Sequence, residues 1–459
     1  MNITEISTLI NKRELSPVDL VKGNLEKIYE ENKKNNSFIT ISDEEALQVA
    51  RKLEKELVEG KIRSKLHGIP IAIKDLIYTK NIRTTMGSKV YENFVPDVDA
   101  TVIKKLKEAG AIIIGKTNTH EYAYGPIGDR SYFGPCLNPY NLKKISGGSS
   151  SGSAAAVGAG MVSLAIGTDT GGSIRIPSSA CGVVGMKPTF GLVSKKGVYD
   201  LAYTLDHVGP ITNNVYDNAL LINIIAGHDP NDPYSIKTLN KDYHHLIGKD
   251  IKGKVIGIPS FYFDLIEEEV QESMKNCINA FESLGAKIEE IKIDCINRIA
   301  VAQAVTIKSE AAAVHMNTFD SYKGIIDSEV YERLEESRKV KAYEYIHSQI
   351  ERKKLIDEYN RAFDHVDVLL TPTLPILPTD IGQREVEIGN QKELVRSALL
   401  RLTSITNYTG NPSISIPCNL SKSGLPIGAQ LIEKHGNEAR LYQFAYALEQ
   451  SLKFTANKK

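Results

Sequence analysis

The sequence predicts an α/β fold in one large domain, residues 1–459, built on a mixed, largely parallel β-sheet with helices on both faces. Apolar runs with strand composition alternate with amphipathic helical patterns. In the second half, a strand at 254–259, a helix at 267–285 and a strand at 286–293 follow one another. This order implies a right-handed crossover between parallel strands. A chain of 459 residues is also long enough to bury a large core.

A helical arm is expected over residues 1–60. Ser16 and Pro17 are typical of a helix N-cap and a first helical position, and apolar residues follow at helical spacing. A second helical pattern starts at Ser42, and Gly60 ends it. Its expected buried face consists of Ala46, Val49, Leu53 and Leu57.

Two apolar runs in the next part of the chain are predicted to be strands. They are residues 71–77, Ile-Ala-Ile-Lys-Asp-Leu-Ile, and residues 111–118, Ala-Ile-Ile-Ile-Gly-Lys-Thr-Asn. Lys74 in the first run is unusual because burial removes water from its ammonium group. A lysine at the end of a strand that reaches solvent is the ordinary interpretation, so this residue alone indicates no function.

The C-terminal half continues the alternation. A long helix is predicted over 342–363, followed by a buried strand at 366–370. Residues 413–417 and 427–432 are expected to be a pair of core strands. A helix at 437–452 closes the fold.

Composition and charge limit the classes of function. The chain has 56 basic and 56 acidic residues, so it lacks the positive charge typical of proteins that bind nucleic acid or an anionic membrane. Five scattered cysteines without a C-x-x-C pattern indicate reduced thiols, not a disulfide framework or a zinc site. No signal peptide and no run of about 18 strongly apolar residues is found. We therefore expect a cytoplasmic protein without a cofactor or metal.

The functional hypothesis rests on residues 146–181. Two glycine-serine turns, at 147–152 and 168–173, enclose a stretch of small and apolar residues. Glycines at this density let backbone N–H groups converge on a ligand. A phosphate-binding loop would need a lysine directly after its second glycine, and a flexible linker would not contain apolar residues such as those at 161–166. We favour a third interpretation, an acyl-transfer site made of two packed serine-bearing turns.

Residues 146–181 resemble the signature of the amidase signature family. They contain G-G-S-S-S-G-S, then a dozen or so small residues, then G-T-D-T-G-G-S-I-R-I-P. The similarity continues through residues 181–189 and covers essentially the whole chain. It implies the fold of that family and the hydrolysis of a linear carboxylic amide to a carboxylate and ammonia or an amine. The expected partner is a small-molecule amide, and a homodimer is left open.

The resemblance assigns catalysis to Lys74, Ser149 and Ser173. Their intervals in the sequence match those of the family's lysine and two serines. No histidine lies in these motifs, so the base would be Lys74 as a neutral amine. A free lysine titrates near about 10.4, so Lys74 must be desolvated to act near neutral pH. The resemblance implies that Lys74 deprotonates Ser149, that Ser149 deprotonates the nucleophile Ser173, and that the Gly148–Ser149 peptide bond is cis.

The backbone of the second turn is expected to stabilise the oxyanion of the tetrahedral intermediate. Its N–H donors would come from Thr170, Gly171, Gly172 and Ser173. Glycines at two of these positions would let several donors converge on one oxygen.

Two further features have supporting roles under the resemblance. The loop Tyr124-Gly125-Pro126 corresponds to the loop that lines the acyl pocket in the family, although packing alone would explain any single tyrosine here. Asp169 and Arg175 are expected to form a salt bridge that braces the second turn.

Three roles are weighed for the chain. We favour a free-standing amidase over the glutamine-hydrolysing A subunit of a tRNA-dependent amidotransferase, which shares the three catalytic residues. That protein needs a cation for the α-carboxylate of glutamine and an acid for its amine. These would fall near Ser328-Glu329 and at Leu400, which lack the required charges. A catalytically idle subunit is disfavoured because Lys74, Ser149 and Ser173 are all present.

Overall fold

The computed structural model describes residues 1–238 and 242–454. Its main sheet contains eleven strands, which are β1 (Phe38–Ile41), β2 (Pro70–Lys74), β3 (Ile112–Thr117), β6 (Leu164–Asp169), β7 (Val184–Lys187), β8 (His207–Thr212), β9 (Val255–Pro259), β10 (Lys287–Ile291), β11 (Val368–Pro372), β14 (Ser413–Leu420) and β15 (Pro426–Ile432). Two small ribbons lie outside it, β4 (Leu137–Asn138) with β5 (Asn141–Ile145) and β12 (Glu385–Ile388) with β13 (Gln391–Leu394).

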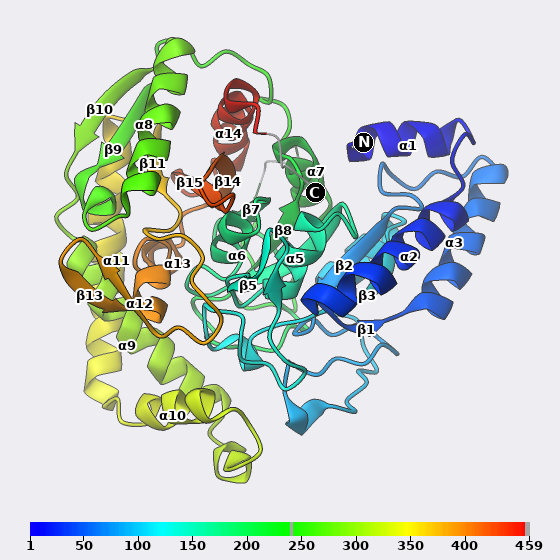
Figure 1. Ribbon diagram of the computed structural model, residues 1–459, viewed down its shortest axis with the longest axis horizontal. Helices are drawn as coiled ribbons and strands as arrows, with labels where there is room; N and C mark the ends of the chain where they lie inside the picture. Colours follow the sequence, from blue (N-terminus) through cyan, green and yellow to red (C-terminus); the bar gives the residue numbers. More distant parts are fainter. Residues whose placement is uncertain (239–241, 455–459) are drawn as a thin grey trace.

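Helices surround this sheet (Figure 1). They are α1 (Ile3–Asn11), α2 (Pro17–Asn35), α3 (Asp43–Val58), α4 (Thr101–Glu108), α5 (Ser151–Gly158), α6 (Arg175–Ala180), α7 (Val215–Ile225), α8 (Glu268–Ser283), α9 (Ile296–Val314), α10 (Ser328–Ser337), α11 (Ala342–Asn360), α12 (Val395–Arg401), α13 (Ser404–Thr409) and α14 (Glu438–Leu452). The expected α/β class with a mixed central sheet is therefore confirmed.

The strand order is β1-β3-β2-β6-β8-β7-β14-β15-β11-β9-β10. Parallel pairs occur in β3-β2-β6 and in β11-β9-β10. The remaining pairs of this described sheet are antiparallel, including all those from β6 through β8, β7, β14 and β15 to β11. The expectation of a largely parallel sheet is therefore wrong, although β9, α8 and β10 do form the predicted parallel unit. The prediction fails in the middle of the sheet, where β7 pairs antiparallel with β14, a strand far along the chain.

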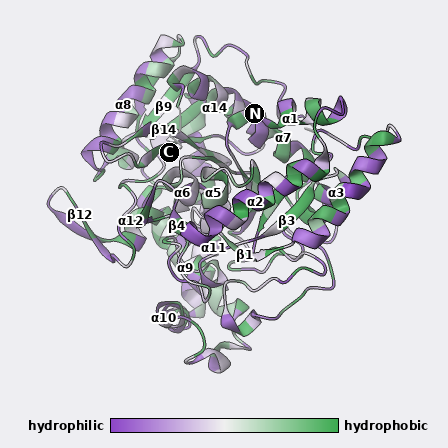
Figure 2. Ribbon diagram, turned by 45° about the vertical axis from the view of Figure 1, so that its right-hand side comes forward, coloured by the Kyte–Doolittle hydropathy of each residue, from purple (hydrophilic) through white to green (hydrophobic). Residues whose placement is uncertain are grey.

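Strand β2 shows why both faces of the sheet are covered. Alternate side chains of a strand point to opposite faces. Ile71 and Ile73 join the largest hydrophobic cluster, whereas Ala72 joins a second cluster with residues of α2, α3 and α5. Figure 2 shows hydrophobic residues along β3 and mixed hydrophilic and hydrophobic residues on α2, α3 and α8, as expected of helices with one face on a core.

The N-terminal arm begins as predicted. The Ser16 hydroxyl accepts hydrogen bonds from the N–H groups of Val18 and Asp19, and Pro17 is the first residue of α2. The arm is not wholly helical, because β1 pairs antiparallel with β3 at the edge of the sheet. In α3 the buried positions include Ala50 in place of Val49, which is 40% exposed.

In the C-terminal half, β14 and β15 form the expected antiparallel pair. Helix α14 matches its predicted range closely, while α11 ends at Asn360 and a short 3-10 turn, Arg361–Asp364, completes the predicted helix. None of the helices in the described ranges is long and apolar enough to cross a membrane.

Candidate active site

Two parallel strands bring the lysine and the second glycine-serine turn together. Strand β2 ends at Lys74, and its neighbour β6 ends at Asp169, directly before the turn. The carboxyl ends of parallel strands meet at one edge of a sheet. Lys74 Nζ consequently lies 2.7 Å from Thr168 Oγ1, and it also lies 2.8 Å from Ser149 Oγ in the first turn.

Burial changes the chemistry of Lys74. The side chain has no exposed surface, and it forms no ion pair within the described chain. Loss of hydration lowers its pKa to about 7, against the opposing influence of the Asp169 and Asp206 carboxylates. A large fraction of Lys74 is therefore a neutral amine near pH 7.

The two serines lie on adjacent turns. Ser149 is fully buried, and the peptide bond that precedes it is cis. The Ser150 N–H donates to the Ser173 carbonyl oxygen at 3.1 Å, which joins the turns. Ser173 is 5% exposed and forms part of a cavity wall. No hydrogen bond links the Ser149 and Ser173 hydroxyls in this part of the structure, so the lysine–serine contact is formed and the serine–serine contact is not.

A buried ion pair holds the second turn. Arg175 Nη2 lies 3.0 Å from Asp169 Oδ1, and neither side chain is exposed. Arg175 also donates to Thr406 and Asn407 of α13 and to Gln430 of β15. Burial alone would raise the pKa of Asp169, but the charge of Arg175 outweighs it and holds that pKa well below its usual range. The expected bracing salt bridge is confirmed.

The Asp169 carboxylate also accepts a hydrogen bond from one of the expected oxyanion donors. Its Oδ1 accepts the Gly172 N–H at 2.8 Å. This contact corrects the prediction that the Gly172 N–H belongs to the oxyanion hole, because that N–H already donates to Asp169. The N–H groups of Thr170, Gly171 and Ser173 have no acceptor among the residues that the structure describes.

A cavity of about 460 Å³ opens beside Ser173. Tyr124, Gly125 and Pro126 form part of its wall, next to Thr170. The structure thus places the predicted acyl-pocket loop beside the candidate nucleophile. Its role in substrate binding stays a prediction.

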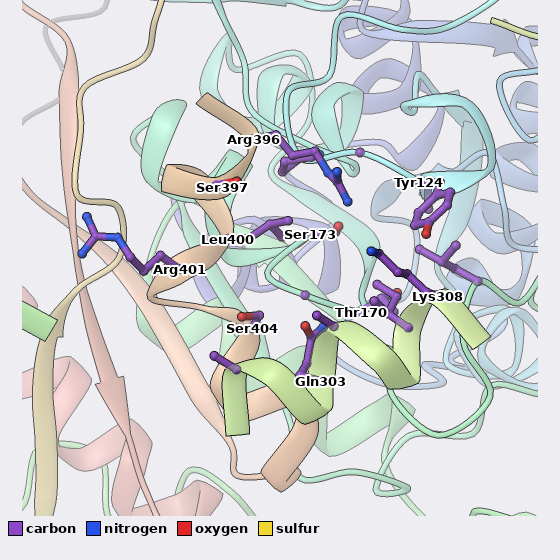
Figure 3. A pocket seen from close by; sticks show the side chains of 18 of the residues that line it. Tyr124, Thr170, Ser173, Gln303, Lys308, Arg396, Ser397, Leu400, Arg401 and Ser404 are labelled. Carbon is purple, nitrogen blue, oxygen red and sulfur yellow. The ribbon is translucent and has the colours of Figure 1, made fainter. Parts of the chain in front are cut away.

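The opposite wall comes from the C-terminal half of the chain. Gln303 and Lys308 of α9 and Arg396 of α12 project into the cavity (Figure 3). Sequence reasoning missed all three, because they belong to no motif and because α9 and α12 were not predicted. Leu400, considered above for the acid, does line the cavity. Glu329 instead forms ion pairs with arginines outside it.

The described residues offer no metal site. Within residues 1–238 and 242–454, no group of three or more His, Cys, Asp or Glu residues is arranged to hold a metal ion. All five cysteines are buried and unpaired.

Comparison with known proteins identifies the family. A family model described as Amidase matches residues 19–442. The chain belongs to the amidase family. The resemblance of residues 146–181 to the amidase signature is thereby confirmed.

Relatives of this amidase span its whole length. The A subunit of glutamyl-tRNA(Gln) amidotransferase from Caldanaerobacter subterraneus subsp. tengcongensis is 39% identical, over 99% of this chain and 97% of that one. A solved structure described as a vestigial protein complex that reveals the evolutionary origins of an s-triazine catabolic enzyme is 29% identical, with a TM-score of 0.94 over 100% of both chains. The corresponding amidotransferase protein from Thermotoga maritima, also an A subunit, is 34% identical, with a TM-score of 0.81 over 96% of this chain and 93% of that one.

Proposed function

We propose that this amidase hydrolyses a linear carboxylic amide through an acyl-enzyme on Ser173. The observation that carries the proposal is the 2.8 Å contact between Lys74 Nζ and Ser149 Oγ, on the turn next to Ser173. A serine hydroxyl is a weak nucleophile until a base takes its proton. A lysine whose pKa burial lowers to about 7 can serve as that base.

The proposed reaction has two steps. In the first, Lys74 takes a proton from Ser149 while Ser149 takes the proton of Ser173, and Ser173 Oγ bonds to the carbonyl carbon. The C–N bond then breaks, and the amine leaves with the proton that Lys74 returns through Ser149. In the second step, water attacks the ester, the same relay moves its proton, and the carboxylate leaves Ser173.

Two details of the site bear on these steps. The N–H groups of Thr170, Gly171 and Ser173 are the proposed donors to the oxyanion, since the Gly172 N–H binds Asp169. The missing hydrogen bond between the two serines does not count against the relay. Catalytic contacts are often long in a free enzyme and tighten when substrate binds.

The comparisons favour a second, more specific candidate over a free-standing amidase. Curated relatives at 36–39% identity, covering 96–98% of their own lengths, are named as the A subunit of a glutamyl-tRNA(Gln) amidotransferase. In that role the chain would release ammonia from glutamine for a partner subunit. These relatives support this alternative better than the free-standing enzyme expected from the sequence.

A serine-reactive fluorophosphonate tests the nucleophile. The label should map to Ser173 by peptide mass spectrometry and disappear in Ser173→Ala. Ser149→Ala should label slowly, since the relay is broken. Ser178→Ala is the matched control, because this buried hydroxyl in the same region has no hydrogen-bond partner among the described residues. A label on Ser149 would overturn the assignment.

The second candidate has its own test. The tagged chain is expressed in its native host and purified, and its rate of ammonia release from glutamine is compared with that from simple amides. Recovery of a tRNA-binding partner together with a preference for glutamine would establish the role within an amidotransferase. A chain that purifies alone and prefers other amides is a free-standing amidase.

A further inference from the structure

Two cationic side chains in the cavity beside Ser173 form no ion pair with any residue that the structure describes. Lys308 of α9 and Arg396 of α12 both line it, and both are half-buried. No carboxylate oxygen lies within ion-pair distance of either one in the described ranges. Figure 3 shows the two side chains reaching from different elements toward the space in front of Ser173.

The other two charges of the lining cancel each other. Arg401 Nε lies 3.7 Å from Glu393 Oε2. Arg401 also donates to the backbone oxygens of Asp264 and Leu265, and in Figure 3 it is turned away from Ser173. The unbalanced charge of the cavity is therefore positive, and it comes from Lys308 and Arg396.

A third cation lies behind the wall. Arg333 of α10 donates to the Tyr124 carbonyl oxygen and pairs with Glu329 at 3.4 Å. Burial lowers the pKa of Arg333 to about 10, and the positive charge of Arg396 acts in the same direction, against the opposing influence of Glu329. Like charges gathered around one cavity raise the free energy of the empty site, and a bound anion relieves this repulsion.

We propose that the amide hydrolysed at this site carries a carboxylate group, held by Lys308 and Arg396, and carries no ammonium group. The proposal rests on the proposed amide hydrolysis at Ser173 and adds the class of substrate to it. A guanidinium binds a carboxylate through two parallel hydrogen bonds, and an ammonium adds a compact charge. Apolar lining residues, Ala304, Ile307 and Leu400, offer contacts to the carbon chain between the two ends.

Glutamine, the substrate in the second candidate function above, fits this cavity less well than an amide with a carboxylate alone, so this proposal argues against that candidate. Its ammonium group would need a free acidic side chain. Among the described lining residues, Glu393 is the one carboxylate, and it already pairs with Arg401. An ammonium in the substrate would therefore meet Lys308 and Arg396 without a partner, and like charges in such a site repel.

The test compares three kinds of amide by ammonia release. They are the monoamides of succinic, glutaric and adipic acid, neutral amides of the same chain lengths, and glutamine. We expect the best monoamide to have a kcat/KM at least about tenfold above its neutral counterpart and above glutamine, the usual scale for a paired charge. Lys308→Met and Arg396→Met, which keep an unbranched apolar side chain but remove the charge, should each reduce the ratio of anionic to neutral kcat/KM by about tenfold.

Lys292→Met is the matched control, because Lys292 is exposed and pairs with Asp294 outside the cavity. It should leave the ratio unchanged. The proposal is overturned if both cavity variants keep the wild-type ratio, or if the wild type prefers neutral amides or glutamine. In either case amide hydrolysis at Ser173 still stands.

Failure of the proposed function would look different, since none of the amides would then be hydrolysed. The anion site is tested separately by calorimetric binding of glutarate to the Ser173→Ala protein. Binding that Lys308→Met and Arg396→Met each weaken about tenfold supports the site. Absence of glutarate binding, or binding that neither substitution weakens, rules it out.

Discussion

Lys74 owes its proposed chemistry to its surroundings. In water a lysine has a pKa near about 10.4, so very little of it is neutral at pH 7. Within the sheet the Lys74 amine meets the hydroxyls of Ser149 and Thr168, and no carboxylate pairs with it in the described structure. These hydroxyl groups accept hydrogen bonds from the amine but, unlike a carboxylate, do not stabilise its charged ammonium form. The side chain can therefore act as a base while it remains fully buried.

The pH dependence of the rate tests this state of Lys74. Its folded pKa of about 7 lies below the usual value, so the neutral base gains population as pH rises through 7. We expect kcat/KM to rise along one limb and level off above that pKa. Lys74→Ala should remove the limb and about 10²–10⁴ of the rate. Lys74→Arg should be nearly as damaging, because guanidinium keeps its proton. Substantial activity in the arginine variant would show that a positive charge, not a base, is needed.

At the scale of elements, the second glycine-serine turn is positioned from several directions. Asp169 ends β6, Arg175 begins α6, and their ion pair contacts side chains of α13 and β15. The Thr403 hydroxyl, just before α13, donates to the Gly171 carbonyl oxygen at 2.6 Å. The geometry of the oxyanion donors therefore depends on elements from both halves of the chain.

Asp169→Asn should destabilise the protein strongly. It leaves the buried Arg175 without its counter-charge, and breaking one partner of such a pair costs about 3–5 kcal/mol in the free energy of unfolding. Asp19→Asn, in an exposed pair with Lys22, is the control and should change it by less than about 1 kcal/mol. Urea unfolding measures both.

The pH dependence of the Asp169 effect follows from its lowered pKa. A carboxyl whose folded pKa lies below its unfolded value contributes stability above the unfolded pKa of about 3.9 and loses it as pH falls. The difference between wild type and Asp169→Asn should therefore stay constant above about pH 5 and shrink progressively as pH falls below that value toward the folded pKa. A constant difference would mean that the aspartate acts through shape and not through charge.

Gly172 tests the turn itself. Its φ is +133°, and a Cβ at this position would lie 2.1 Å from Thr403 Oγ1. Gly172→Ala should therefore displace the turn and reduce kcat by at least about 10², the scale of a lost oxyanion donor. Gly424→Ala is the control, since its φ is also positive but no atom of the described residues lies within 4 Å of the added carbon. Unchanged activity in Gly172→Ala would contradict the assigned role of the turn.

At the scale of the whole molecule, one strand pair joins the two halves of the sheet. Strands β1, β3, β2, β6, β8 and β7 come from the first half of the chain, and the other five come from the second. Strand β7 pairs with β14 from Ser413 to Ser415. The cavity has the same origin, because Ser173 and its facing wall belong to different halves.

A truncated chain, residues 1–248, tests this dependence. It keeps Lys74, Ser149 and Ser173 but exposes β7 as a free edge, which invites aggregation. We expect an insoluble fragment that fluorophosphonate does not label, and recovery of labelling when residues 249–459 are expressed with it. A soluble fragment labelled at Ser173 would show two independent domains and contradict the single domain expected from the sequence.

The sequence by itself identified the family, the α/β class and the three candidate catalytic residues. It could do so because residues 146–181 form a continuous pattern that resembles the family's signature, and this resemblance assigns Lys74 through its interval from Ser149. The resemblance also implies that the loop of Tyr124 lines the acyl pocket. A continuous motif depends on neighbours in the chain, which a sequence displays directly.

Only the tertiary structure decided which groups meet. Strands β7 and β14 pair antiparallel at the centre of the sheet although they are far apart in the chain, so no local sequence pattern predicts this contact. The use of the Gly172 N–H by Asp169 depends on how the turn folds back. Likewise Lys308 and Arg396 look like ordinary surface charges in the sequence. Their proposed importance comes from a shared cavity in which the described residues offer no free carboxylate, because a charge acts through its distance from others and its access to water.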